Sequence, residues 1–111
     1  MNDPDARARP DERGPATPLH LAAVRNDASA IRELAARGML SAINARDEFG
    51  QTPLHSAVFG GCEDAVVALL ELGADPNLVN GFGVPPLWTA EDDFGLERIA
   101  AILRQHGGTK G

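Results

Sequence analysis

The 111-residue sequence has little of several residue types, and each shortage excludes a class of protein. It has one cysteine, Cys62, so it can form no internal disulfide and no cysteine zinc site, which favours a reducing compartment. No apolar run approaches about 18 residues, and residues 1–15 contain no apolar stretch, so the sequence predicts neither a membrane span nor a secretory signal. We therefore expect a cytoplasmic protein.

Basic residues are also scarce, and this bears on the choice of partner. Ten basic residues against sixteen acidic ones give a formal net charge of -6. That balance disfavours a nucleic acid or an anionic membrane as partner and favours a protein with a basic or mixed apolar and basic surface. The imbalance is local, because residues 48–80 carry five acids and no Lys or Arg. A solvated face and an acidic binding surface both remain open for this segment.

What is present fits one small globular domain. Apolar residues make up 43% of the chain, and aromatic residues only 5%, which predicts a single core of aliphatic side chains. Arginine supplies nine of the ten basic residues and alanine is frequent. Because that bias is common in proteins from GC-rich bacterial genomes, we expect a bacterial source.

A repeated unit organises the chain from residue 16 onward. The tetrapeptide Thr17-Pro18-Leu19-His20 recurs 35 positions later as Thr52-Pro53-Leu54-His55, and again, in weaker form, as Pro85-Pro86-Leu87-Trp88. Small residues, an aliphatic stretch and a closing glycine follow each copy. The units span about residues 16–47, 48–80 and 81–111 of one domain, 16–111. Residues 1–15 have no periodicity and are expected to form a disordered or partly ordered tail or cap.

Each unit predicts a pair of helices. Thr is a strong N-cap, Pro suits the first helical position, and His can hydrogen-bond back to the Thr hydroxyl in the manner of a capping box. Each tetrapeptide therefore starts a first helix of about eight residues. Apolar residues at helical spacing, such as Ile31 and Leu34, predict the second helix, which Gly38 and Gly73 end in the first two units.

Polar, glycine-containing stretches at 44–50 and 77–83 connect the units and carry the turn signals of a hairpin tip, of which Asn80-Gly81 is the clearest. With the tetrapeptides, the glycines and the period, they make residues 16–111 resemble the ankyrin repeat. The resemblance implies an all-α solenoid of about three helix-turn-helix units with β-hairpin or loop tips. Three repeats are about the fewest that bury a continuous core, so we expect modest stability.

The sequence departs from the family pattern in two places. Repeat one carries two extra residues before its tip, within 39–43. Repeat three has Pro85 and Trp88 where the motif has Thr and His, and it places Glu91 and Arg98 at positions that are apolar in repeat two. These polar residues suit a terminal repeat whose outer face meets water.

Catalytic and metal-binding interpretations have less support than packing. His20 and His55 occupy equivalent positions of stacked units, about 8 to 10 Å apart, and capping with hydrogen bonds between repeats explains both. Cys62, His55 and Glu63 or Asp64 could superficially supply a nucleophile, a base and an acid, but no basic residue in that repeat lowers the thiol pKa. No calcium-loop or phosphate-loop pattern occurs either. We predict no catalytic site, no metal and no cofactor.

A protein-binding surface is the remaining candidate. The resemblance implies that partners dock on the concave face of hairpin tips and first helices. Three of the four phenylalanines fall at positions outside the repeat framework there, and aromatic residues are frequent hot spots. Packing of one tip on the next, or of Trp88 on repeat two, is the alternative. The predicted partner-binding residues are Val24, Arg25, Glu48, Phe49, Gln51, Phe59, Phe82, Val84, Trp88, Asp92 and Asp93.

The sequence thus predicts a non-enzymatic protein-protein interaction module, expected to be a monomer, that acts by occupying its partner's surface. A narrower alternative is a cytosolic inhibitor or immunity protein that masks a basic toxin or enzyme. An enzyme that uses Cys62 and His55 is the alternative of another class. A structural role, with self-association through the exposed end of repeat one or three, is a further alternative.

Overall fold

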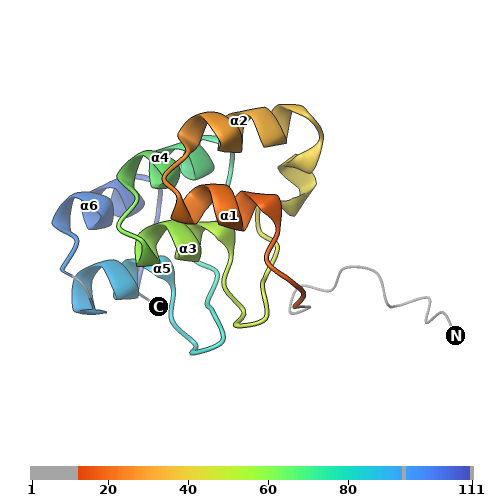
Figure 1. Ribbon diagram of the computed structural model, residues 1–111. Coiled ribbons are helices and arrows are strands. Elements are labelled where there is room, and N and C mark those ends of the chain that lie inside the picture. Colours follow the sequence, from red (N-terminus) through yellow and green to blue (C-terminus); the bar gives the residue numbers. More distant parts are fainter. Residues whose placement is uncertain (1–12, 94, 111) are drawn as a thin grey trace, which may run out of the picture.

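The computed structural model describes residues 13–93 and 95–110 and shows two layers of helices (Figure 1). One layer contains α1 (Pro18–Val24), α3 (Pro53–Phe59) and α5 (Pro86–Trp88). The other contains α2 (Ala28–Ala36), α4 (Glu63–Glu71) and α6 (Glu97–Gln105). Two shorter elements are the 3-10 helix η1 (Met39–Ala42) and the π-helical turn η2 (Thr89–Asp93). Each sequence unit supplies one helix pair, so the all-α class with about three repeats is confirmed.

Two capping boxes explain where α1 and α3 begin. In α1, Thr17 Oγ1 accepts the backbone N–H of His20 at 3.4 Å, and His20 Nδ1 accepts the backbone N–H of Thr17 at 3.0 Å. Thr52 and His55 repeat the arrangement at 3.3 and 3.2 Å. Each box satisfies backbone donors that lack a helical partner. The helix starts predicted from the first two tetrapeptides are confirmed.

The same histidines join each repeat to the next. His20 Nε2 lies 2.7 Å from the carbonyl oxygen of Gln51, and His55 Nε2 lies 3.2 Å from that of Val84. Because Nδ1 accepts a backbone N–H, the ring proton is on Nε2, which donates to these carbonyls. Burial lowers the pKa of His55 from 6.5 to about 4, although its bond to Val84 opposes the shift. The contact between repeats two and three therefore involves neutral His55.

The core runs through all three repeats and is most complete in the middle one. Leu54, Val66 and Leu69 of repeat two are fully buried, because this repeat has a neighbour on each side. Gly73 follows α4 with φ +95°, a conformation that ends the helix and that glycine adopts without strain. Within the described ranges, no helix has both the length and the apolarity to cross a bilayer.

The tips are loops closed by side-chain caps. Asp47 Oδ1 accepts the backbone N–H groups of Phe49 and Gln51, both at 2.9 Å. Asn80 Oδ1 accepts those of Phe82 at 2.9 Å and Val84 at 3.3 Å. In the described part of the chain, the β-pairing is a single bridge between Arg13 and Arg46. The tips are therefore loops with a hairpin-like hydrogen bond at the base rather than paired strands.

The turn predicted at Asn80-Gly81 is present, but its two glycines have different roles from those of the glycines in a two-residue hairpin turn. Gly83, with φ +78°, is the residue in the left-handed region. Gly81 donates its N–H to the carbonyl oxygen of Phe49 at 2.9 Å, and a Cβ on Gly81 would come within 2.4 Å of that oxygen. Gly81 is thus required by the close approach of neighbouring tips, whose spacing the local sequence does not encode.

Repeat three begins differently. Pro85 at the N-cap makes no side-chain capping bond, and α5 has 3 residues before the chain turns into η2. The first helix of repeat three therefore has about the expected length, since α5 (3 residues) runs directly into η2 (5 residues), but its second part is a π-helix, while α1 and α3 are α-helices of 7 residues each. At the other end, the Gly14 N–H donates to the carbonyl of Arg46 at 3.0 Å. The predicted tail falls mostly in residues 1–12, outside the described part of the structure.

Candidate functional site: an aromatic groove

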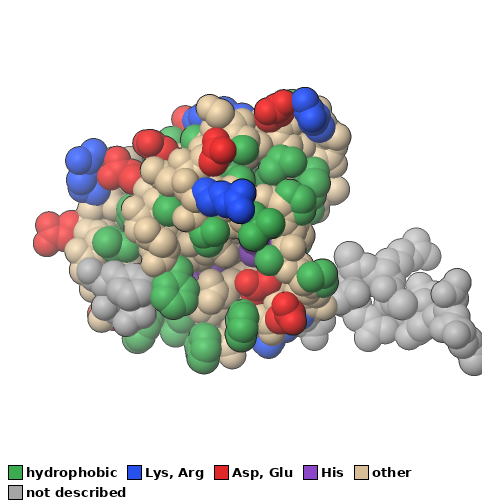
Figure 2. Space-filling view, in the orientation of Figure 1, with side chains coloured by type: hydrophobic (Ala, Val, Ile, Leu, Met, Phe, Trp, Pro, Cys, Tyr) green, Lys and Arg blue, Asp and Glu red, His purple; other side chains and the backbone are tan. Residues whose placement is uncertain are grey.

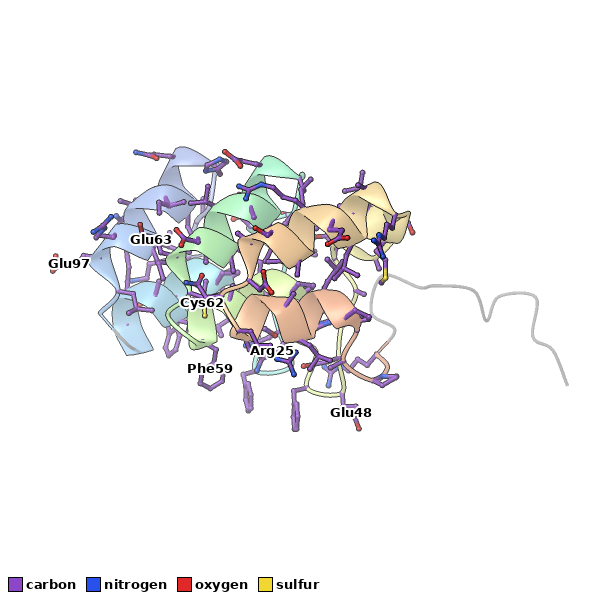
Figure 3. The ribbon with its side chains drawn as sticks, turned by 45° about the horizontal axis from the view of Figure 1, so that its top comes forward. Arg25, Glu48, Phe59, Cys62, Glu63 and Glu97 are labelled. Atoms are coloured by element: carbon purple, nitrogen blue, oxygen red, sulfur yellow. The ribbon has the colours of Figure 1, made fainter. Side chains whose placement is uncertain are left out.

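A groove of about 450 Å³ lies where the tip of repeat three meets the first helices. Its apolar walls are Phe59 at the end of α3, Phe82 and Val84 of the tip, and Trp88 of α5. Gln51, His55, Asn80 and Thr89 add polar atoms around them. Figure 3 shows Phe59 projecting from the edge where first helices and tips lie. The groove is thus lined mainly by large apolar side chains with a few hydrogen-bonding groups.

The aromatic side chains on this face are strongly exposed. Phe82 is 78% exposed, Phe49 64%, Phe59 56% and Trp88 38%. Packing of one tip on the next therefore does not bury Phe49 or Phe82. Figure 2 shows hydrophobic side chains gathered along this edge of the molecule. We define these four residues as the aromatic strip. Large apolar surface kept in water is a mark of interaction sites.

Local structure explains why Trp88 lines the groove. In repeats one and two the equivalent position is a histidine that faces its own N-cap threonine. Trp88 follows Pro85, which offers neither a hydroxyl nor an N–H, so no capping box can form. The indole instead forms a wall beside Phe82 and Thr89. The loss of the motif in repeat three thus widens the apolar face.

The structure brings together only part of the predicted site. Of the predicted residues, Gln51, Phe59, Phe82, Val84 and Trp88 line the groove. The sequence interpretation missed three lining residues: His55, which capping explained fully, and Asn80 and Thr89, which carried only turn or helix signals.

Other predicted residues lie outside the groove lining. Arg25 ends α1, and Val24 and Glu48 are exposed; Figure 3 shows Arg25 and Glu48 along the same edge as Phe59. Asp92 is held by an ion pair to Lys110 at 2.7 Å. The side chain of Asp93 is not among those that the structure describes. Phe49 stands on the neighbouring tip.

The acidic charge of residues 48–80 does not flank the aromatic strip as a group. Glu63, Asp64 and Glu71 belong to α4, in the second layer, where Glu63 pairs with Arg98 at 3.0 Å and Glu71 with Arg32 at 3.1 Å. Glu48 lies at the tip. Of the two possibilities that the sequence left open for this segment, the acids of α4 therefore belong to a solvated face and not to an acidic surface beside Phe49 and Phe59. The net charge of a sequence segment does not give the charge of one surface, because the tip and the helices of a repeat lie on different faces of the molecule.

The thiol of Cys62 is not placed for nucleophilic chemistry. Cys62 is 6% exposed, precedes α4, and directs Sγ at the carbonyl oxygen of Val24 at 3.5 Å. Burial raises the pKa of this thiol, whereas a nucleophile needs it lowered. Over residues 13–93 and 95–110, His, Cys, Asp and Glu form no group of three that could hold a metal ion.

Comparisons with known proteins agree with the repeat architecture. The family described as "Ankyrin repeats (3 copies)" matches residues 2–80. The chain is 38% identical over 84 residues to serine/threonine-protein kinase VIK of Arabidopsis thaliana, which covers 76% of this chain and 19% of that protein. It is 38% identical over 97 residues to the nuclear factor NF-kappa-B p105 subunit of Rattus norvegicus, covering 84% of this chain and 10% of the relative.

A third relative is NF-kappa-B inhibitor alpha of Sus scrofa, 32% identical over 91 residues, which are 80% of this chain and 29% of that protein. The chain therefore spans less than a third of each of these relatives. The family match ends at residue 80, yet α5, η2 and α6 continue the same stack beyond it. Ankyrin repeats are generally protein-protein interaction modules and typically non-catalytic. This chain belongs to the ankyrin-repeat family.

Proposed function

We propose that this ankyrin-repeat chain binds a partner protein through its tips and first helices, with the groove beside Trp88 as the anchoring site. The observation that carries the proposal is the groove of about 450 Å³ with Phe59, Phe82 and Trp88 exposed around it. Such a volume is within the range of about 300 to 1,000 Å³ that holds compact apolar groups. A bulky apolar side chain of the partner would be desolvated there.

The composition of the site determines how binding would work. Aromatic side chains supply large contact area with few rotatable bonds, so they concentrate binding free energy in few residues. Gln51, Asn80 and Thr89 offer hydrogen bonds at the groove that orient the inserted group. The chain would act on its partner by covering the partner's apolar surface for as long as the two proteins are bound.

The partner's surface is proposed to be apolar at its centre. Glu48 at the tip favours a basic group beside that apolar centre. The same proposal includes the cytoplasmic location that the composition leads us to expect. The narrower role, masking of a basic toxin or enzyme, stays a prediction.

The experiment is affinity capture with the immobilised full chain from a lysate of the native host, followed by identification of bound proteins by mass spectrometry. Phe49→Ala combined with Phe82→Ala removes two exposed rings and should abolish capture of the bound protein. The matched control, Leu40→Ala, removes an exposed aliphatic side chain of η1, which belongs to neither the tips nor the first helices, and should leave capture intact. Undiminished capture by the phenylalanine variant, with an unchanged circular dichroism spectrum, would contradict the proposed face.

A further inference from the structure

Asn80 begins the turn at the tip of repeat three and is followed by Gly81. Among the asparagines of the chain, it alone precedes a glycine. This pair favours deamidation, because the backbone nitrogen after an asparagine can attack the side-chain amide, and glycine has no Cβ to hinder the attack. Asn80 is half-buried and lines the aromatic groove, whereas Gly81 is exposed. The sequence thus places a reactive pair at the groove.

The turn activates the electrophile of this reaction, the side-chain carbonyl carbon of Asn80. Its oxygen, Oδ1, accepts the backbone N–H groups of Phe82 at 2.9 Å and Val84 at 3.3 Å. Attack on the carbonyl carbon moves negative charge onto this oxygen, and two backbone donors stabilise such an oxyanion. The turn therefore lowers the barrier to attack on Asn80 Cγ.

The neighbouring tip holds the nucleophile, the backbone nitrogen of Gly81. The two tips lie side by side (Figure 1), and the Gly81 N–H donates to the carbonyl oxygen of Phe49 at 2.9 Å. The nitrogen must lose this proton before it attacks, and the resulting anion would face the lone pairs of the Phe49 oxygen. The contact is tight, since a Cβ on Gly50 would come within 2.6 Å of the Gly81 nitrogen. Attack on Asn80 therefore requires the two tips to separate.

We infer that Asn80 is a site of spontaneous deamidation and that the contact between Gly81 and Phe49 controls its rate. When the tips separate, the Gly81 nitrogen gives its proton to hydroxide or water and bonds to Asn80 Cγ, and the amide nitrogen leaves as ammonia. Water then opens the cyclic imide at either of its carbonyl groups. The net reaction consumes water, releases ammonia and needs no other reactant. It leaves a carboxylate, negatively charged near neutral pH, at residue 80.

The two products differ in their effect on the tip. Water that breaks the new bond at Cγ gives aspartate, and Asp47 shows that aspartate forms the same turn, because its Oδ1 accepts the N–H groups of Phe49 and Gln51. Water that breaks the original peptide bond gives isoaspartate, whose main chain is longer by a methylene group, so Gly81 is moved from its contact. Either product places a charge at the groove. That effect on binding rests on the proposed function, whereas the modification itself does not.

The experiment follows the mass of the full chain, and of its proteolytic peptides, over time near neutral pH. In the chain unfolded by urea, Asn80 should deamidate faster than Asn77, an internal control that precedes a leucine. In the folded chain the reaction at Asn80 should be at least about tenfold slower, because a hydrogen-bonded tip is open for a small fraction of the time. Equal rates at Asn77 and Asn80 in urea, or equal rates at Asn80 in the folded and unfolded chains, would overturn the inference.

Matched glycine variants test control by the contact between the tips. Gly50 and Gly61 have φ angles of +74° and +67°, so alanine strains the backbone alike at both positions. At Gly50 the added Cβ presses on the Gly81 nitrogen, whereas nothing lies within 4 Å of a Cβ at Gly61. Gly50→Ala should therefore speed deamidation of the folded chain at least about tenfold, and Gly61→Ala less than about twofold. Equal rates in the two variants would contradict control by this contact.

Hydrogen exchange in the parent chain supplies a measurement that does not depend on either variant folding. Exchange of the Gly81 amide proton requires the same separation of the tips as deamidation does. Its protection factor, measured by NMR, should therefore match the slowing of deamidation at Asn80 within about threefold. Deamidation slowed far more or far less than this exchange would show that another step controls the reaction, and would overturn the inference.

Discussion

The first helices of repeats two and three start from the same frame and differ in what one position does. In α3, His55 closes a capping box with Thr52 and reaches the carbonyl of Val84 in the next repeat. In α5, Trp88 stands at the equivalent position after Pro85, no box forms, and the α-helix changes into the π-helix η2 after 3 residues. One position thus holds the stack together in repeat two and lines the groove in repeat three.

The difference shows that one position of the repeat can either stabilise the stack through hydrogen bonds or contribute exposed aromatic surface. The framework residues of repeat two are buried and their polar atoms are satisfied within the stack. Repeat three lacks the capping box and instead has the exposed side chain of Trp88, which lines the groove. The aromatic groove therefore lies beside the repeat whose sequence departs most from the motif.

The largest expected effect comes from the core leucine of each first helix. Leu54→Ala should lower the free energy of unfolding by about 2 to 5 kcal/mol, because Leu54 is fully buried between two neighbouring repeats. For Leu87→Ala the decrease in the free energy of unfolding should be at the low end of that range, about 2 kcal/mol, because α5 is short and belongs to the last described repeat. Urea denaturation measures both. Equal losses would show that repeats two and three are packed alike.

Acidification should affect the stack through His55. Its pKa is 6.5 in the unfolded chain and about 4 in the folded one, so the folded state binds fewer protons between these values. The contribution of neutral His55 is complete above pH 6.5 and is lost as pH falls through 4, by about 3 kcal/mol in all.

Unfolding midpoints in urea at pH 7 and pH 4.5 measure this loss. In His55→Gln the amide still offers a donor toward Val84 but does not titrate, so the difference between the two pH values should shrink. A variant as pH-sensitive as the parent chain would assign the effect to other groups.

The smallest expected effect comes from restoring the motif in repeat three. Pro85→Thr with Trp88→His should rebuild a capping box at α5 and raise the free energy of unfolding by about 0.5 to 1 kcal/mol. The same change removes the indole wall and should abolish capture of the partner. If the double variant were less stable than the parent chain and still captured the partner, a capping box would not stabilise this repeat and Trp88 would not be needed for binding.

Much of the fold was predictable because its signals are local. Thr17 and Thr52 with their histidines, the apolar spacing around Ile31, and Gly38 and Gly73 encode helix starts, faces and ends within a few residues. The π-helical continuation of the first helix in repeat three was not predicted, because the path of η2 depends on packing against α3 and α6.

The site was predictable in its aromatic part and not in its electrostatics. Phe59, Phe82 and Trp88 stood out because large apolar residues at non-framework positions have no packing role in the motif. His55 was missed as a groove residue since one side chain serves capping, stacking and the groove wall. The acids of α4 could not be placed from the sequence, because a sequence segment does not say which layer carries its charge.

The most direct test of the central claim is the dissociation constant of the captured partner for two single variants. The account predicts that Phe82→Ala weakens binding about 30-fold or more, the loss of about 2 kcal/mol typical of a hot spot, while Leu40→Ala in η1 changes it less than about twofold. Equal affinities of both variants and the parent chain would show that the partner binds elsewhere.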